Sequence, residues 1–172
     1  DTPSLHVTSQ RPTPPPASED MDNARGEGGR SEAQVESTLR IKAAAAFAEG
    51  NFDHAMALYG EVLEMKRLAL GDSHPDIAET LNNMGLVKDA EGDHHSALAF
   101  HEEALKMTEA ELGASHPDFA QTLNNMGVAK RSLGDYCGAM ALFEQALPIF
   151  QNALGDAHPD VAQTYHNMGS VR

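Results

Sequence analysis

The sequence predicts an all-α fold in which antiparallel pairs of helices stack into an α-solenoid, and three observations predict it. A phrase of twelve residues returns every 42 residues, as HPDIAETLNNMG, HPDFAQTLNNMG and HPDVAQTYHNMG from His74, His116 and His158. Apolar residues recur at helical spacing in two separate stretches of each interval. A glycine closes each interval, at Gly71, Gly113 and Gly155. Self-similarity of this length indicates units that bury their apolar faces by stacking.

Each interval contains two predicted helices. In the second repeat, apolar residues have helical spacing over 77–87, the polar run EGDHH interrupts the pattern, and helical spacing resumes over 97–107. A proline opens each first helix, where its missing N–H costs nothing, and an aspartate follows it at the positive end of the helix dipole. Ser73 and Ser115 are predicted N-caps, whereas the last copy has Ala157 and is expected to be less well capped.

The first thirty residues differ in composition from the rest of the chain. The stretch RPTPPPASEDMDNARGEGGR is rich in proline, glycine and charge, and it has too few large apolar residues to offset the entropy of ordering. We predict a disordered N-terminal tail over 1–30 and a repeat domain over 31–172. The repeats span about 31–70, 73–112 and 115–154, with a partial fourth repeat over 157–172.

The charge of the chain excludes two classes of partner. Twelve basic and 26 acidic residues give a formal net charge of −14, which disfavours the basic footprint that nucleic acids require and binding to an anionic membrane surface. No apolar stretch reaches the ~18 residues of a membrane-spanning helix. We therefore expect neither a nucleic acid nor a membrane as partner.

Catalysis and metal binding have little support in the sequence. Cys137 is the only cysteine, which fits a reducing compartment and a cytoplasmic location, and we interpret it as a small apolar filler. The three histidines of the repeated phrase lie one repeat apart, too far to share one metal ion. His94 and His101 are interpreted as packed side chains. We expect no enzymatic activity, no metal and no cofactor.

The small residues identify the type of repeat. Glycines and alanines at one set of positions return 42 residues later, with Gly85, Gly92, Ala97 and Ala104 matched by Gly127, Gly134, Ala139 and Ala146. This pattern resembles the tetratricopeptide repeat, in which small residues lie where two helices cross. The period alone also suits HEAT and armadillo repeats of about 40–47 residues. The resemblance implies a right-handed superhelix of helix-turn-helix repeats.

The repeated phrase HPDxAxTLNNMG is similar to the kinesin light chain subclass of these repeats. The chain departs from that subclass in two respects. Residues 1–30 have no heptads of a coiled coil that would bind a motor heavy chain, and Lys88 and Lys130 replace an aromatic residue in the first helix.

The resemblance also implies a binding groove. In tetratricopeptide proteins, asparagines on the first helices hold the backbone of an extended peptide in a concave groove. This role is carried over to Asn83, Asn125 and Asn167, with assistance from their neighbours Asn82, Asn124 and His166. An amide donates and accepts at once, so it can pair with a peptide backbone without reading its sequence. The alternative is that these asparagines bond to the neighbouring helix or to their own backbone.

Four cations fall on the predicted first helices, namely Arg40, Lys88, Lys130 and Arg131. Three of them lie near helix C-termini, where they complement the dipole. They also form a local basic stripe that would favour an acidic peptide, as the resemblance to kinesin light chains implies. The chain's own acidic segment, Ser18–Asp22, would then be an internal competitor for the groove.

Together these observations predict a non-catalytic protein-protein interaction module that binds an extended peptide or partner protein as an adaptor or scaffold. The alternative is an architectural array that self-associates, with the exposed C-terminal half-repeat as the contact surface. A further alternative is the interaction part of a larger signalling or enzymatic protein.

Overall fold

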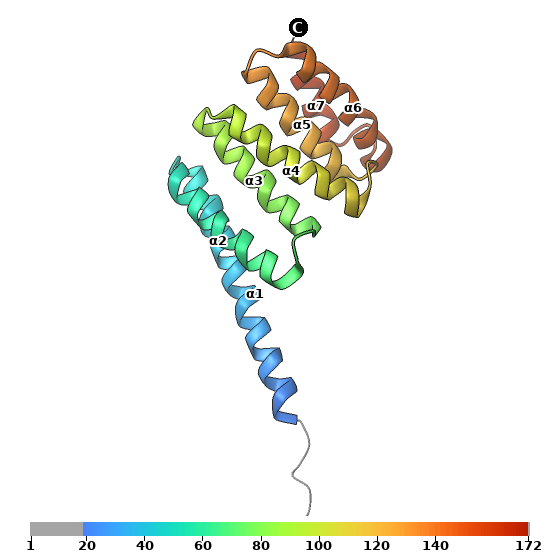
Figure 1. Ribbon diagram of the computed structural model, residues 1–172. Helices are drawn as coiled ribbons and strands as arrows, with labels where there is room; N and C mark the ends of the chain where they lie inside the picture. The colour runs from blue at the N-terminus through green and yellow to red at the C-terminus, as the bar shows by residue number, and fades with distance from the viewer. Residues whose placement is uncertain (1–18, 172) are drawn as a thin grey trace, which may run out of the picture. The chain divides into compact units, whose positions relative to one another are not determined.

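The computed structural model describes residues 19–171, with side chains from Glu32 onward (Figure 1). Its helices are α1 Glu19–Ala48, α2 Phe52–Leu70, α3 Pro75–Glu91, α4 His94–Leu112, α5 Pro117–Ser132, α6 Tyr136–Leu154 and α7 Pro159–Gly169. No strand occurs among the described residues. The all-α prediction, with two helices in each full repeat and one in the last, is confirmed.

The chain divides into two units, Asp1–Gln34 and Val35–Arg172, and the second unit holds the repeats. The helix α1 begins at Glu19, so it enters the segment 1–30 for which the sequence predicts a disordered tail. Starting a helix is costly, but extending one adds a hydrogen bond for each ordered residue, which composition alone does not register. Residues 1–18, with the PTPPP run and the first residue of the Ser18–Asp22 segment, lie outside the described residues.

Histidines cap the first helices α3, α5 and α7. The Nδ1 atoms of His74, His116 and His158 each accept a hydrogen bond at 3.2–3.3 Å from the backbone N–H two residues on. The prediction that Ser73 and Ser115 cap these helices is wrong, because the histidine directly before the proline takes the N-cap position. Since His158 caps α7 in the same way, Ala157 does not weaken that helix start.

In the second and third repeats, a glycine lies where the two helices cross. A methyl group at Gly85 would overlap the ring of His101, and a methyl group at Gly127 would overlap the ring of Phe143. Both rings are completely buried, as are the crossing alanines of α4 and α6. The helices approach this closely because a ring packs directly on the backbone of the facing helix.

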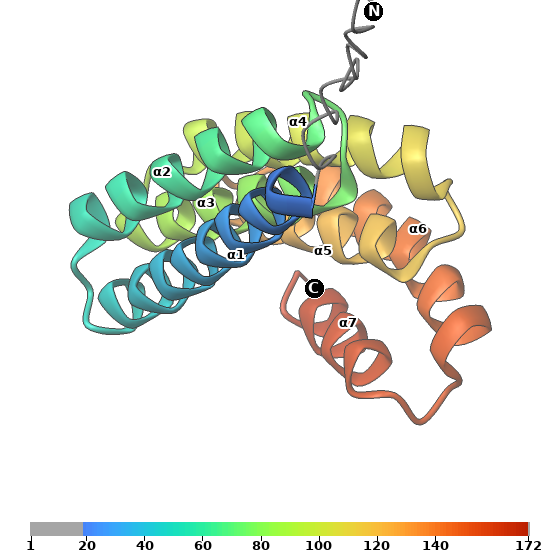
Figure 2. The same ribbon diagram turned by 90° about the horizontal axis from the view of Figure 1, so that it is seen from below.

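The helices of Val35–Arg172 pack in chain order. Each of α2 to α6 lies against the next helix, and the first helices also meet one another, α3 with α5 and α5 with α7. The first helices and the second helices therefore form two layers (Figure 2). One buried cluster draws residues from α1, α2, α3 and α4, with Leu58, Ile77 and Leu81 among them. Another draws residues from α5, α6 and α7, including Leu123 and Phe150.

We predict that Gly127→Ala destabilises the chain by about 1–3 kcal/mol, because the added methyl group overpacks against the buried Phe143 ring. The matched control is Gly60→Ala in α2, where a Cβ atom meets no neighbour within 4 Å. This control should stabilise the chain by about 0.5–1 kcal/mol through helix propensity. Urea unfolding measures both changes, and an equal effect of the two substitutions would contradict close packing at Gly127.

Asp135, the N-cap of α6, provides a prediction about pH. Its pKa lies below the ordinary value, first because the Lys130 ammonium donates to its carboxylate at 2.8 Å and then because the Gly138 N–H donates at 2.9 Å. A lowered pKa in the folded state stabilises the protein above the unfolded pKa, and this contribution is lost on acidification. Asp135→Asn should therefore be less stable than wild type at pH 7, with a difference that shrinks below about pH 4. A difference that persists unchanged to pH 3 in urea unfolding would refute this.

Candidate functional site

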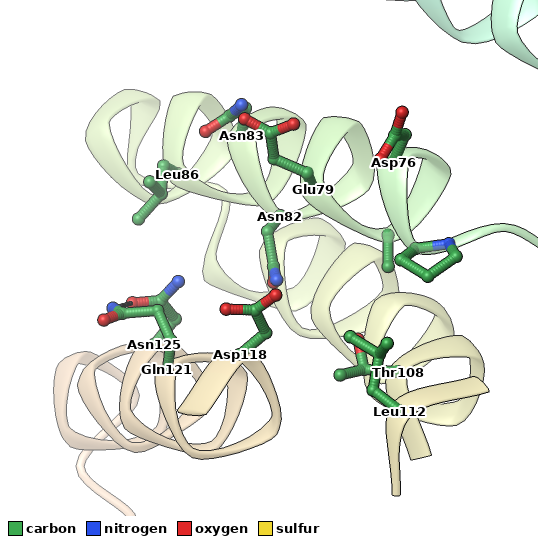
Figure 3. Close-up of a pocket in the computed structure, with 12 residues that line it drawn as sticks. Asp76, Glu79, Asn82, Asn83, Leu86, Thr108, Leu112, Asp118, Gln121 and Asn125 are labelled. Atoms are coloured by element: carbon green, nitrogen blue, oxygen red, sulfur yellow. Dashed lines mark hydrogen bonds between the residues drawn. The ribbon is translucent and has the colours of Figure 1, made fainter. Parts of the chain in front are cut away.

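A cavity of about 500 Å³ opens between α3 and α5 and reaches the C-terminal end of α4. We call it the central cavity. Its lining combines acidic, amide and apolar side chains, among them Asp76, Glu79, Asp118, Asn82, Asn83, Gln121, Asn125, Leu86 and Leu112. In Figure 3, Asn82 and Leu86 extend from α3 toward α5, and Gln121 and Asn125 extend from α5 toward α3. The cavity thus lies between the first helices of two successive repeats.

Asn82 ties three helices together at the edge of this cavity. Its Oδ1 lies 2.9 Å from Nδ1 of His101 on α4, and its Nδ2 donates to Thr122 Oγ1 on α5 at 2.7 Å. The Thr122 hydroxyl donates in turn to the Asp118 carbonyl at 2.9 Å. Since Thr122 therefore accepts from Asn82, the Asn82 oxygen faces His101, and His101 Nδ1 is the donor. Asn82 connects one repeat to the next.

His101 is completely buried, in the position that Phe143 occupies in the next repeat. Its Nε2 lies 3.5 Å from Asp89 Oδ2 and makes no hydrogen bond with any residue that the structure describes, while Asp89 Oδ1 lies 3.0 Å from His94 Nδ1. His94 and His101 therefore make polar contacts with Asp89 and Asn82 in addition to packing against their neighbours. Among the residues that the structure describes, no group of three or more His, Cys, Asp or Glu side chains could hold a metal ion.

Two of the six predicted groove residues bond to each other instead of facing open space. Asn167 on α7 donates from Nδ2 to Asn124 Oδ1 on α5 at 3.1 Å, and its own Oδ1 accepts from Gln163 at 3.1 Å. Both asparagines are buried. Asn82, Asn124 and Asn167 therefore make the inter-repeat bonds that the alternative interpretation described. His166 lies next to Asn167 and is exposed.

Asn83 and Asn125 differ from these three. The Asn125 side chain accepts a hydrogen bond from Gln121 at 3.1 Å, but its Nδ2 donates to no residue in the described part of the chain. Asn125 is 8% exposed and lines the central cavity. Asn83 also lines the cavity, and its side chain makes no hydrogen bond within 19–171. Two of the predicted asparagines thus bring amides with unused hydrogen-bonding capacity to one cavity.

The cations of the predicted basic stripe have partners of their own. Lys88 lies 2.7 Å from Glu91, a hydrogen bond that raises the pKa of Lys88, and Lys130 lies 2.8 Å from Asp135. Arg40 lies 3.6 Å from Glu79, and Arg131 donates to Ser170. None of the four lines the central cavity.

The position that shapes this cavity lies outside the predicted groove residues. Residues 66, 108 and 150 are equivalent in the repeat, and they are lysine, threonine and phenylalanine. Lys66 and Phe150 fill the spaces before α3 and α7, with exposed fractions of 7% and 1%, whereas the shorter Thr108 lines the central cavity. The repeat alignment carries this signal, because only one of the three residues is small.

Comparisons with known proteins support a single fold. BtubC (BKLC) from P. vanneervenii has a TM-score of 0.73 and 25% identity, covering 87% of this chain and 60% of that chain. A putative kinesin light chain with nearly identical TPR-like repeats from Podosopora anserina has a TM-score of 0.70 and 19% identity, covering 78% and 64%. The Sgt2 TPR domain from Aspergillus fumigatus has a TM-score of 0.57 and 20% identity, covering 79% and 76%.

The chain spans less than two thirds of the first two of these proteins. No curated protein matches it. Within the described residues, no helix has the length and apolarity needed to cross a membrane. A family model described as the tetratricopeptide repeat matches residues 34–110 and 111–172. The chain therefore belongs to the tetratricopeptide repeat family, and its repeats resemble those of kinesin light chains.

Proposed function

We propose that the first helices around the central cavity bind an extended peptide or a segment of a partner protein, and that the chain acts as a non-catalytic cytoplasmic adaptor or scaffold of kinesin light chain-like type. Tetratricopeptide repeats are protein-protein interaction modules, so the proposal concerns where this one binds. The observation that carries it is the pair Asn83 and Asn125, whose amides line one cavity and have unused hydrogen-bonding capacity.

A peptide backbone matches this arrangement chemically. The Asn125 Nδ2 needs an acceptor, which a peptide carbonyl supplies, and the Asn83 amide can both donate and accept. Leu86 and Leu112 give the same cavity apolar walls, and both are partly exposed. A site that combines apolar walls with a few placed polar groups is typical of binding sites.

The preference for an acidic peptide stays a prediction about the C-terminal ends of the first helices. Lys88, Lys130 and Arg131 lie there, but each already has a neighbouring acceptor. An acidic partner would have to displace these contacts, which are solvent-exposed or partly exposed and therefore weak.

Self-association is the second candidate, and one observation favours it. Tyr165 on α7 is 53% exposed, which leaves a large aromatic side chain open to contact with another molecule. In this account the outer face of α7 would pack against a second copy. Sedimentation velocity at rising concentration tests it, since a mass that grows with concentration in wild type but not in Tyr165→Glu supports self-association.

The peptide proposal predicts that the double variant Asn83→Ala, Asn125→Ala binds selected peptides at least about 10-fold more weakly than wild type, because each lost hydrogen bond is worth about 1 kcal/mol. The probes are peptides selected on the wild-type chain from a random twelve-residue phage library, with Kd measured by calorimetry. Circular dichroism and the urea midpoint should change little, because neither side chain bonds across repeats.

Two controls make the result specific. Asn152→Ala alters an exposed asparagine of α6 outside the cavity and should leave Kd unchanged. Asn124→Ala removes the partner of Asn167 and should lower stability by about 1–3 kcal/mol. Equal Kd values for wild type and the double variant would rule out the central cavity as the binding site.

A further inference from the structure

The three repeat boundaries have one equivalent space, which we call the slot, between the second helix of one repeat and the first turns of the next first helix. The residue at position 66, 108 or 150 enters it, and the residue at position 36, 78 or 120 faces it. The pairs are Glu36 with Lys66, Ala78 with Thr108, and Ala120 with Phe150. In the first pair the Lys66 ammonium lies near the Glu36 carboxylate. In the third pair the Phe150 ring and the Ala120 methyl group belong to one buried cluster.

Lys66 shows what chemistry the slot accepts. Its ammonium donates to the Asp76 carbonyl at 2.9 Å and to Thr80 Oγ1 at 3.0 Å. The carboxylates of Glu36 and Glu79 lie 3.8 and 3.7 Å away. This buried lysine is stable because oxygen acceptors surround its charge on several sides.

The middle slot is empty because both of its residues are small. Thr108 is 2% exposed, and its hydroxyl donates to the Ala104 carbonyl of its own helix at 2.9 Å. Neither Thr108 nor Ala78 fills the space, and both line the central cavity. The cavity therefore contains the place that Lys66 and Phe150 occupy at the other two boundaries.

Two of the four acceptors of the first slot have counterparts that are open to a ligand in the middle one, the Asp118 carbonyl and the Gln121 side chain, whereas Ala78 replaces Glu36 and Thr122 already accepts from Asn82. The Asp118 carbonyl is equivalent to that of Asp76, and it accepts from the Thr122 hydroxyl as the Asp76 carbonyl accepts from the Thr80 hydroxyl. The Asp76 carbonyl accepts from the Lys66 ammonium in addition to the Thr80 hydroxyl, so the Asp118 carbonyl can receive an ammonium in the same way. Gln121 takes the place of Glu79, and its Nε2 donates to Asn125, which leaves its Oε1 as an acceptor.

The charge around the middle slot is negative. Asp76, Glu79 and Asp118 line the central cavity, and no lysine or arginine does. Arg40 and Lys66 balance Glu79, at 3.6 and 3.7 Å. Among the described residues, Asp76 and Asp118 each have one histidine as their only basic neighbour within 4.0 Å, at 3.7 and 3.6 Å. A cation entering the cavity would therefore meet carboxylates that lack permanent counter-charges.

We propose that the central cavity takes a lysine side chain from the bound peptide, with its ammonium in the place that Lys66 occupies in the preceding slot. This inference rests on the proposed peptide-binding function and names the ligand chemistry of the same site. Ala78 and Leu112 contact the aliphatic stem of the lysine, as buried stems require apolar walls. The Asp118 carbonyl, the Gln121 oxygen and the nearby carboxylates receive the ammonium, while the Asn125 Nδ2 donates to a carbonyl of the peptide.

The test uses the full chain and the selected twelve-residue peptides. We expect the selected peptides to share a lysine. Replacing this lysine with norleucine keeps the aliphatic stem and removes the charge, so it should weaken binding by about 10- to 100-fold. The Thr108→Lys variant supplies the ammonium from the chain itself, so the lysine and norleucine peptides should bind to it with the same Kd. The Thr108→Val variant leaves the slot open, because valine and threonine are of equal size, so the lysine peptide should still bind more tightly than the norleucine peptide.

A second pair of variants covers the case in which Thr108→Lys fails to fold. Asp118→Asn removes a carboxylate from the cavity and should weaken the lysine peptide several-fold. Asp160→Asn makes the same change at the equivalent position of α7, outside the cavity, and should leave binding unchanged.

The outcomes separate this inference from the proposed function. If selected peptides lose binding to the Asn83→Ala, Asn125→Ala variant but bind equally well with norleucine, or are enriched in acidic residues, the lysine slot is refuted and the groove stands. If no selected peptide responds to the asparagine variant, both are refuted. Equal binding of the lysine peptide to a folded Thr108→Lys variant and to wild type would also overturn the lysine slot.

Discussion

The architecture depends on the contact of a buried ring with a glycine backbone inside the second and third repeats. His101 packs on Gly85 and Phe143 packs on Gly127, so closely that neither glycine can carry a methyl group. Such a contact fixes both the distance and the register of the two helices. Because the same contact recurs at a 42-residue interval, residues that are equivalent in sequence reach equivalent places at each repeat boundary. A single change at one position is then enough to make one boundary different from the others.

The middle boundary differs through two such changes. In place of the Phe143 ring, His101 can hydrogen-bond, and it holds the oxygen of Asn82. At the following boundary the Asn124 oxygen accepts from Asn167, whereas the Asn82 oxygen is directed to His101 and makes no such bond with Asn125 in the described part of the chain. The other change is Thr108, which is too short to fill the slot that Lys66 and Phe150 fill. The Asn125 nitrogen, which has no acceptor among the described residues, and the open slot therefore line the same cavity, and both follow from residues of α4.

Much of the fold follows from the sequence, since helix starts, helix ends and crossing points are local features that repeat. The hydrogen-bond partners of the asparagines do not follow from the sequence. Asn82 and Asn124 lie in the same LNNMG phrase, yet one bonds to a histidine and the other to an asparagine, because the choice depends on side chains from other helices. Ser73 failed as a cap for a local reason, since the adjacent histidine competes for the same N–H. Lys66 and Thr108 differ visibly in the alignment, but whether a slot is open depends on the facing residue as well.

The central claim is that the three slots are equivalent in space and that Thr108 leaves the middle one open. The most direct measurement is a crystal structure of the Thr108→Lys variant at a resolution that places the new side chain. The account predicts that its ammonium lies within about 3 Å of the Asp118 carbonyl oxygen, as that of Lys66 lies 2.9 Å from the Asp76 carbonyl. A side chain that turns away into solvent, or a separation of α4 from α5, would contradict it.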